Sequence, residues 1–282
     1  MMILVFGATG NVGRHVVRGL LAAGEGVRAF TRDAAGAGLG PAVRVVQGDL
    51  GRPDTLPAAF DGVTGVVMIS AGADAASHEL AVAEAVRGHG VKRVVKLSSV
   101  AALRPVRDAY GAAHAAAERA FAETGAHVTA LRAAAFMSNA LQWRWSIPAG
   151  RIHQPYSDIP RALVDPMDVA AVAVACLTTG DHGDGAYQLT GPEALTGSEQ
   201  AARISVVVGH RVECVRAEPE RSRDGMVAAG LPAEYAEALL ASLADPDPAR
   251  GGTPLPTVRR ILGRPPATFD DWLARHAGEF GG

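Results

Sequence analysis

The N-terminal segment MMILVFGATGNVGRHVV places three glycines between a short apolar run and an amphipathic stretch with helical spacing. This arrangement constrains the fold more than any other feature, because it is typical of a strand, a tight loop and a helix that open a βαβ unit. Gly7 suits the tight turn, Gly10 leaves room for a ligand near the backbone, and Gly13 lets the helix pack closely on the strand. Unpaired N–H groups and the dipole at the start of the helix attract an anion. The segment therefore predicts a loop that binds the pyrophosphate of a dinucleotide.

Short β-prone runs with little polar alternation recur along the first half of the chain, a pattern typical of strands covered on both faces. They comprise residues 3–7, 27–31, 43–47, 65–70, 93–98 and 127–132. Stretches with helical spacing lie between them, at residues 11–23, 53–60, 77–89 and 111–124. This alternation predicts an α/β fold with a doubly wound parallel sheet, the Rossmann architecture.

The pattern changes after about residue 133, where prolines interrupt the chain more often. A helix at 166–178 and a strand near 186–190 are expected as late additions to the same sheet. We therefore expect residues 1–150 to form the nucleotide-binding core and residues 151–282 a smaller C-terminal substrate lobe. Within that lobe, residues 165–190 are expected to return to the core sheet.

The composition argues against several classes of partner. A formal net charge of −2 provides no basic field that would attract nucleic acid. No uninterrupted apolar stretch reaches the roughly 18 residues of a transmembrane helix, and the apolar start has no cationic flank. We therefore expect a cytoplasmic protein without a membrane anchor, either a monomer or a homodimer. Cys176 and Cys214 lie among apolar neighbours and are expected to be inert thiols, and no metal site is expected.

The end of the second predicted strand distinguishes between cofactors. A cation there binds the 2′-phosphate of NADP(H), whereas an acidic residue binds the ribose diol of NAD(H). Arg32 can form charge-assisted hydrogen bonds with a phosphate, while Asp33 opposes this if it points inward. We expect NADP(H) in preference to NAD(H). Further cofactor contacts are expected from the loop and from the ends of the later strands: Thr9, Asn11, Val12, Asp49, Leu50, Ser70, Ala71 and Ser98. For Asp49, the alternative is a cap of the following helix.

Several longer motifs point to one family. They are GATGNVG at 7–13, KLSS at 96–99, TALRAAAFMSN at 129–139, DPMDVAAVA at 165–173 and YQLTGPEALT at 187–196. Together these motifs resemble the NmrA-like branch of the atypical short-chain dehydrogenases. The resemblance implies an NADPH-dependent quinone reductase, an azoreductase-like enzyme, a ketoreductase that tailors aromatic polyketides, or a redox-sensing regulator without catalysis.

Ordinary short-chain dehydrogenases donate a proton from a Tyr that has a Lys four residues later, a pair that cannot occur in this chain. Its only lysines, Lys92 and Lys96, precede all its tyrosines. The nearest analogue is Tyr110, with His114 one helical turn later on the same face. These two residues and Ser99 are the candidates around the reacting carbonyl. The resemblance supports His114, because quinone-reductase relatives carry His at that position. Each candidate has an alternative role. Tyr110 could be an aromatic of the pocket wall, His114 an ordinary histidine on the helix face, and Ser99 a cap at the end of the strand.

The absence of a Tyr-x-x-x-Lys pair affects which hydride acceptors the protein can reduce. Hydride transfer turns a ketone into an alkoxide, so that a positioned acid accelerates the reaction roughly 10²–10⁴-fold. A quinone becomes a hydroquinone anion, which is stabilised much like a phenolate with a pKa of about 10. The chain should therefore favour acceptors that stabilise their own charge, such as quinones or ketones beside phenols.

Large side chains follow the sixth predicted strand, where ligands meet the carboxyl ends of such sheets. A substrate wall is expected from Phe136, Met137, Asn139, Trp143, Trp145 and Tyr156, unless these residues only join the two lobes. Glu118 and Arg132 are expected to form a structural ion pair. Asp165 and Asp168 are expected to cap the helix at whose start they lie.

These features predict an NADPH-dependent reductase that transfers hydride directly to a planar aromatic ketone or quinone, with no metal or flavin. A polyketide-tailoring ketoreductase fits the aromatic wall and the Ala-, Gly- and Arg-rich composition typical of a GC-rich genome. The alternatives are a general quinone or azo reductase and a non-catalytic NADP-sensing regulator. Epimerases and dehydratases of nucleotide sugars need the absent Tyr/Lys pair.

Overall fold

The computed structural model describes residues 1–103, 109–180 and 182–280. Within these residues, seven parallel strands form one sheet in the order β3-β2-β1-β4-β5-β6-β8. The strands are β1 (Met2–Phe6), β2 (Gly26–Thr31), β3 (Val43–Gln47), β4 (Gly65–Met68), β5 (Arg93–Ser99), β6 (His127–Ala133) and β8 (Gly185–Leu189). The order reverses between β1 and β4, and a crevice at the carboxyl ends of the strands is expected at such a reversal. The predicted Rossmann architecture is confirmed.

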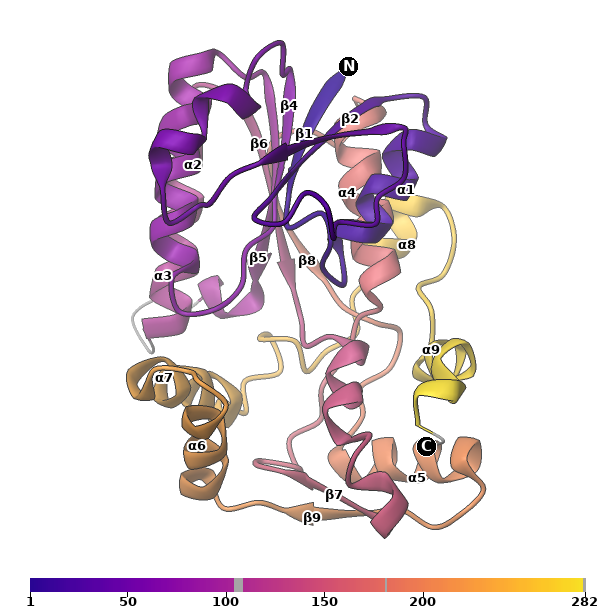
Figure 1. The fold of residues 1–282 in the computed structure, drawn as a ribbon. Helices are drawn as coiled ribbons and strands as arrows, with labels where there is room; N and C mark the ends of the chain where they lie inside the picture. The colour runs from indigo at the N-terminus through magenta and orange to yellow at the C-terminus, as the bar shows by residue number, and fades with distance from the viewer. Residues whose placement is uncertain (104–108, 181, 281–282) are drawn as a thin grey trace.

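Helices cover both faces of the sheet (Figure 1). On one face lie α1 (Gly13–Ala22), α4 (Pro166–Thr178) and α8 (Thr257–Leu262), and on the other lie α2 (Ala75–His89) and α3 (Ala109–Ala122). Successive residues of β1 therefore enter different hydrophobic clusters: Ile3 and Val5 pack with α1 and α4, whereas Leu4 and Phe6 pack with α2. Burial on both faces explains the uninterrupted apolar character of the predicted strands.

The helix expected at 53–60 is a wrong prediction. The segment forms two short 3₁₀ turns, Pro53–Thr55 and Pro57–Ala59. Pro57 lacks the N–H that a continuous helix would use, and its ring clashes with the carbonyl four residues earlier. The prolines therefore divide the stretch despite its helical spacing.

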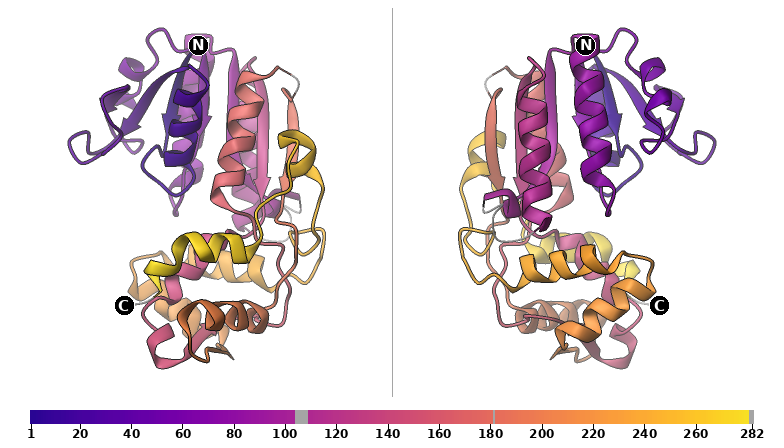
Figure 2. Two further views of the ribbon diagram at one scale, coloured as in Figure 1. Left: turned by 90° about the vertical axis from the view of Figure 1, so that its right-hand side faces the viewer. Right: turned by 90° about the vertical axis from the view of Figure 1, so that its left-hand side faces the viewer.

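A smaller lobe lies beyond the carboxyl ends of the strands (Figure 2). It contains a two-stranded parallel sheet of β7 (Arg151–Gln154) and β9 (Glu213–Arg216) and the helices α5 (Gly197–Val208), α6 (Pro219–Ala228), α7 (Ala233–Ala244) and α9 (Phe269–His276). Its hydrophobic cluster includes Trp143, Ile147, Phe269 and Trp272. The packing of the lobe thus begins before residue 150, with the 3₁₀ turn Met137–Trp143.

Two buried carboxylates in the first turn of α4 attach the C-terminal segment to the core. Asp165 caps the helix as predicted, accepting from the Met167 N–H at 2.8 Å, and it also pairs with Arg275. The predicted cap at Asp168 is wrong. Its carboxylate accepts instead from the Ala267 N–H at 2.7 Å and pairs with Arg264 at 2.7 Å, because the chain near residue 267 returns to the start of α4.

Cys176 and Cys214 are both free thiols. Burial raises the pKa of Cys176 to about 12, and burial also raises the pKa of the half-buried Cys214. Both side chains therefore stay protonated at neutral pH, in agreement with the expectation of inert thiols. Among the described residues, no helix combines the length and the apolar character that crossing a membrane requires.

Candidate active site

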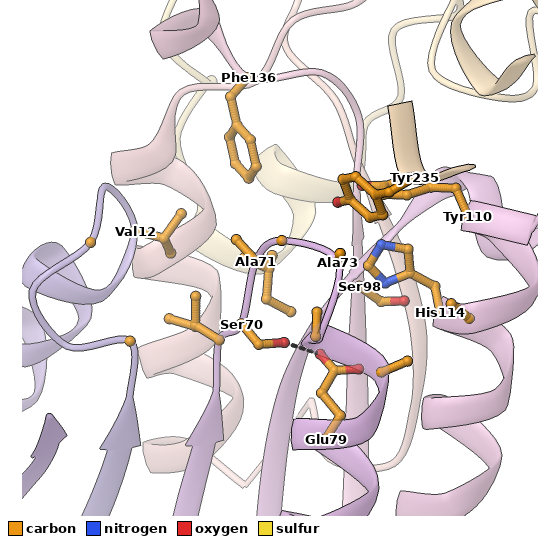
Figure 3. A pocket seen from close by; sticks show the side chains of 18 of the residues that line it. Val12, Ser70, Ala71, Ala73, Glu79, Ser98, Tyr110, His114, Phe136 and Tyr235 are labelled. Carbon is orange, nitrogen blue, oxygen red and sulfur yellow. Dashed lines mark hydrogen bonds between the residues drawn. The ribbon is translucent and has the colours of Figure 1, made fainter. Parts of the chain in front are cut away.

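A cavity of about 720 Å³ lies at the carboxyl ends of β1, β4 and β5, where the strand order reverses (Figure 3). The core contributes the glycine loop, the segment after β4 and the end of β5, and the lobe closes the cavity with α7. The lining includes Gly7, Thr9, Gly10, Asn11, Val12, Ser70, Ala71, Glu79, Ser98, Tyr110, His114, Phe136, Asn139 and Tyr235. Most of the predicted cofactor residues therefore border one cavity.

The backbone of the glycine loop leaves no room for a side chain at Gly7 or Gly13. Gly7 has a φ of +69°, and a Cβ there would lie 2.6 Å from the Ile69 carbonyl oxygen. A Cβ on Gly13 would lie only 2.0 Å from the Gly7 carbonyl oxygen, so Gly13 packs behind the loop and outside the cavity lining. Gly10 borders the cavity, and its N–H donates to Gly7 O at 3.0 Å. The loop thus lines the cavity as far as Val12, the residue that precedes α1, and the start of a helix is the position suited to a pyrophosphate.

The two charged residues after β2 differ in their contacts. Asp33 accepts the Gly36 N–H at 2.9 Å, so its carboxylate faces its own loop. Arg32 is exposed and lies outside the cavity lining. With Asp33 occupied locally, Arg32 is the charged side chain at the end of β2 that is suited to the 2′-phosphate. Asp49 likewise accepts from Gly51 N–H at 2.9 Å, and neither it nor Leu50 borders the cavity.

Replacing Arg32 by Ala tests this assignment. We expect Arg32→Ala to weaken NADPH binding roughly ten- to a hundredfold, the value of a charge-assisted hydrogen bond, with little change for NADH. Equilibrium titration with both cofactors measures the difference. Arg18→Ala, which removes an exposed cation from α1, is the matched control, and equal losses for NADPH and NADH would contradict the role of Arg32.

Three rings lie together on one side of the cavity, opposite Val12 (Figure 3). Tyr110 and His114, one turn apart on α3, meet edge to face with ring centroids 4.7 Å apart. Tyr235 from α7 is 6.1 Å from Tyr110. Burial raises the pKa of Tyr235, and a backbone hydrogen bond from Gly72 opposes this shift. The phenol is protonated at neutral pH, as an ordinary tyrosine is. No sequence signal identified Tyr235, because only the docking of the lobe brings α7 to the core.

The structure does not support Ser99 as a substrate donor. Its Oγ accepts from the Ala101 N–H at 3.1 Å, as a strand-end cap, and the residue does not line the cavity. The neighbouring Ser98 does line it, and its hydroxyl donates to Glu118 at 2.5 Å. Successive residues of a strand face opposite sides, which explains why only one of the two serines reaches Glu118.

The predicted substrate wall divides into three groups. Phe136 and Asn139 line the cavity, whereas Trp143 and Tyr156 line a second cavity next to it. Two residues lie at neither cavity: Met137, buried in the core of the lobe, and Trp145, 82% exposed beneath the Arg144 guanidinium. Met137 and Trp145 therefore do not act as wall residues. The 3₁₀ turn that holds this segment directs its side chains to several sides, which their closeness in sequence cannot reveal.

A buried ionic network forms the floor of the cavity. Lys96, fully buried in β5, pairs with Glu79 of α2 at 3.2 Å, and Ser70 donates to Glu79 at 2.7 Å (Figure 3). Burial raises the pKa of Glu79, against the attraction of Lys96. The predicted pair of Glu118 and Arg132 is confirmed at 2.6 Å. Although burial opposes it, hydrogen bonds from Arg132 and Ser98 lower the pKa of Glu118.

The fold and the cavity define a nucleotide-dependent α/β protein, and comparisons with known proteins agree. Residues 7–180 match a family described as NAD(P)H-binding, and the chain belongs to that family. It is 39% identical to a (4-alkanoyl-5-oxo-2,5-dihydrofuran-3-yl)methyl phosphate reductase of Streptomyces griseus and 35% identical to an NAD(P)H azoreductase of Xenophilus azovorans, in each case over 99% of both chains.

A solved NADPH-dependent quinone oxidoreductase of Escherichia coli is 25% identical, with a TM-score of 0.81 over 97% of this chain and 99% of that one. These comparisons confirm the resemblance to atypical short-chain reductases. The chain is an NADPH-dependent reductase, and its cofactor is NADP(H).

Proposed function

We propose that the chain reduces a planar, conjugated carbonyl compound, either a quinone or an aromatic ketone. When bound, NADPH supplies the hydride. The observation that carries the proposal is a single cavity with a glycine loop on one side and the Tyr110 and Tyr235 rings on the other. Aromatic walls of this kind favour flat, delocalised guests, because ring faces and edges attract each other.

The acceptors named for the relatives share one chemical property. Quinones and azo compounds delocalise the charge that a hydride brings, and the alkanoyl-oxo-dihydrofuran of the Streptomyces griseus relative also contains conjugated carbonyl groups. That last name also includes a phosphate ester. We infer that the acceptor of this chain is of the same electronic kind, which agrees with the lack of a Tyr and Lys pair in its sequence.

The chain's own residues would assist at the developing oxyanion. Tyr110 and Tyr235 bring hydroxyl groups to the cavity wall, and His114 stands against the Tyr110 ring. A hydroxyl that remains protonated can donate a hydrogen bond to the oxygen that becomes negative, or transfer its proton to it. Phe136, on another side of the cavity, would hold the flat acceptor in place (Figure 3).

The test is NADPH oxidation by the purified protein with a panel of quinones, azo dyes and polycyclic aromatic ketones. We expect Tyr110→Phe, Tyr235→Phe or His114→Ala to lower kcat for a ketone by roughly 100-fold at the most affected position, and for a quinone by less than about tenfold. Tyr187→Phe is the control, since this tyrosine lies in β8 and lines neither large cavity.

Two outcomes would contradict the proposal. If all three variants stay within about threefold of the wild type on a confirmed ketone, well below the general-acid range, these residues do not assist the reaction. If no acceptor supports oxidation while NADPH and NADP⁺ bind equally well, the chain acts as a cofactor sensor.

A further inference from the structure

A second cavity of about 720 Å³ adjoins the first one. Phe136 and Asn139 line both cavities, so they form the boundary between them. The far walls come from the lobe alone, from β7, β9 and α6. Phe136 and Asn139 are therefore the residues that a molecule held beside the glycine loop would pass to reach the second cavity.

The second cavity combines apolar walls with positive charge. Trp143, Leu163 and Met226 contribute apolar surface. The charged lining residues are Arg161, Arg216, Arg221 and Glu218, and the lining also includes His153. Three guanidinium groups against one carboxylate leave a net positive charge. Such a lining suits an amphiphilic guest with an apolar body and an anionic end.

Arg161 is the cation best placed to bind this anionic end. Its backbone is held by two hydrogen bonds with Leu195, at 3.0 and 2.9 Å, and its Nη2 donates to the Leu243 carbonyl oxygen. Among the described residues, no carboxylate forms an ion pair with Arg161, although Asp245 attracts it from a distance. Burial and the nearby Arg250 lower the pKa of Arg161. A partly buried guanidinium with N–H groups to spare is suited to an oxyanion, which it can bind with a planar fork.

The other two arginines differ from Arg161. Arg216 is exposed and pairs with Asp158 at 3.6 Å, and Arg221 is exposed on α6. Solvent screens such groups, so they attract an anion to the entrance more than they hold it. We therefore expect Arg161 to make the specific contact with the anionic end of the guest.

We propose that the second cavity is an anion subsite, in which Arg161 binds a phosphate, sulfonate or carboxylate group carried by the acceptor. This proposal rests on the proposed function, since it gives the conjugated carbonyl compound an anionic arm. The conjugated ring lies in the first cavity, and the arm passes Phe136 into the second one. Neutral quinones are then poorer substrates than anionic quinones of the same shape.

Matched quinones test the subsite by kinetics. The probes are 3-(1,4-naphthoquinon-2-yl)propanoate, its methyl ester, and the phosphate monoester of the corresponding propanol, each assayed with NADPH. We expect Arg161→Gln to lower the ratio of kcat/KM for each anion to that for the ester by at least about tenfold. The larger loss identifies carboxylate or phosphate as the preferred group. Arg211→Gln is the control, because that exposed arginine pairs with Glu213 at 2.7 Å and lines neither large cavity.

A binding measurement separates failure of the subsite from failure of the proposed function. Calorimetry of 2-naphthyl phosphate and 2-naphthol with the NADP⁺-saturated protein needs no turnover. We expect the phosphate to bind at least about tenfold more tightly, an advantage that Arg161→Gln removes and the milder Arg221→Gln reduces. An advantage that survives Arg161→Gln, or equal losses for both ligands, overturns the subsite. Phosphate binding that does not compete with the quinone shows a separate ligand site and also overturns it.

Discussion

Gly13→Ala is expected to eliminate most NADPH binding. The added Cβ would lie 2.0 Å from the Gly7 carbonyl oxygen and 2.7 Å from its carbon, both of which are backbone atoms that cannot rotate away. The start of α1 must then move from the loop, and with it the loop residues Gly10, Asn11 and Val12 that line the cavity. If this displacement costs roughly 3 kcal/mol, the upper range of overpacking, the Kd for NADPH rises about 100-fold. Fluorescence titration with NADPH measures it.

Gly88→Ala is the matched control for Gly13→Ala. Gly88 lies inside α2 with an ordinary helical backbone, and a Cβ there meets nothing within 4 Å. This variant should bind NADPH like the wild type and gain up to about 1 kcal/mol of stability from the better helix former. If Gly13→Ala binds NADPH within about threefold of Gly88→Ala, the close packing of the loop on α1 does not support the cofactor site.

Lys96→Met is expected to lower the free energy of unfolding by ~3–5 kcal/mol, the effect of removing one partner from a buried ion pair. Lys96 is fully buried and its partner Glu79 is 2% exposed, so the remaining carboxylate would lose its cation while staying largely buried. Urea denaturation at neutral pH measures the loss. Lys92→Met is the control, because the only other lysine of the chain is exposed and should change stability little.

The pH dependence of Lys96→Met provides a second measurement. Burial raises the folded-state pKa of Glu79 above its unfolded value, so protonation favours the folded state. The contribution of the neutral acid is fully present below the unfolded pKa and is lost as the pH rises through the folded pKa. The deficit of Lys96→Met should therefore be smaller near about pH 5 than near about pH 8.

A double variant removes both charges of the buried Lys96 and Glu79 pair. Glu79→Leu combined with Lys96→Met should recover most of the stability that Lys96→Met loses, because an apolar pair leaves no charge buried. If the double variant is as unstable as Lys96→Met alone, the loss comes from packing and not from the orphaned carboxylate. A deficit that is the same at both pH values would lead to the same conclusion.

Local signals predicted the parts of the molecule that depend on neighbouring residues. The glycine loop was recognisable because its conformation and its contact with α1 depend on a few adjacent residues, and the strands because burial on both faces leaves uninterrupted apolar runs. The same reasoning failed at 53–60, where the prediction relied on helical spacing although two prolines lie in the segment. It also failed at Asp168, whose partners Arg264 and Ala267 lie about 100 residues away.

Two cavity residues that the sequence did not single out come from distant segments. Tyr235 borders the first cavity because the lobe docks against the carboxyl ends of the strands, and Arg161 borders the second cavity together with β7, β9 and α6 of the lobe. Closeness in sequence also led to wrong predictions. Met137 and Trp145 follow β6 closely, as Phe136 does, and were expected in the same wall, yet Met137 is buried in the lobe and Trp145 is 82% exposed. Side-chain direction in the irregular segment after β6 depends on what the segment packs against.

Residue types and their spacing were enough to predict the doubly wound parallel sheet and the glycine loop, and they exclude a Tyr-x-x-x-Lys pair. The tertiary structure was needed to identify the rings that line the first cavity, the carboxylate that pairs with Lys96 beneath it, and Arg161, which lines the second cavity without a carboxylate partner among the described residues. The physical reason is that a strand-to-helix turn is specified by a few adjacent residues, whereas a cavity depends on surfaces from separate segments whose relative positions are set by packing.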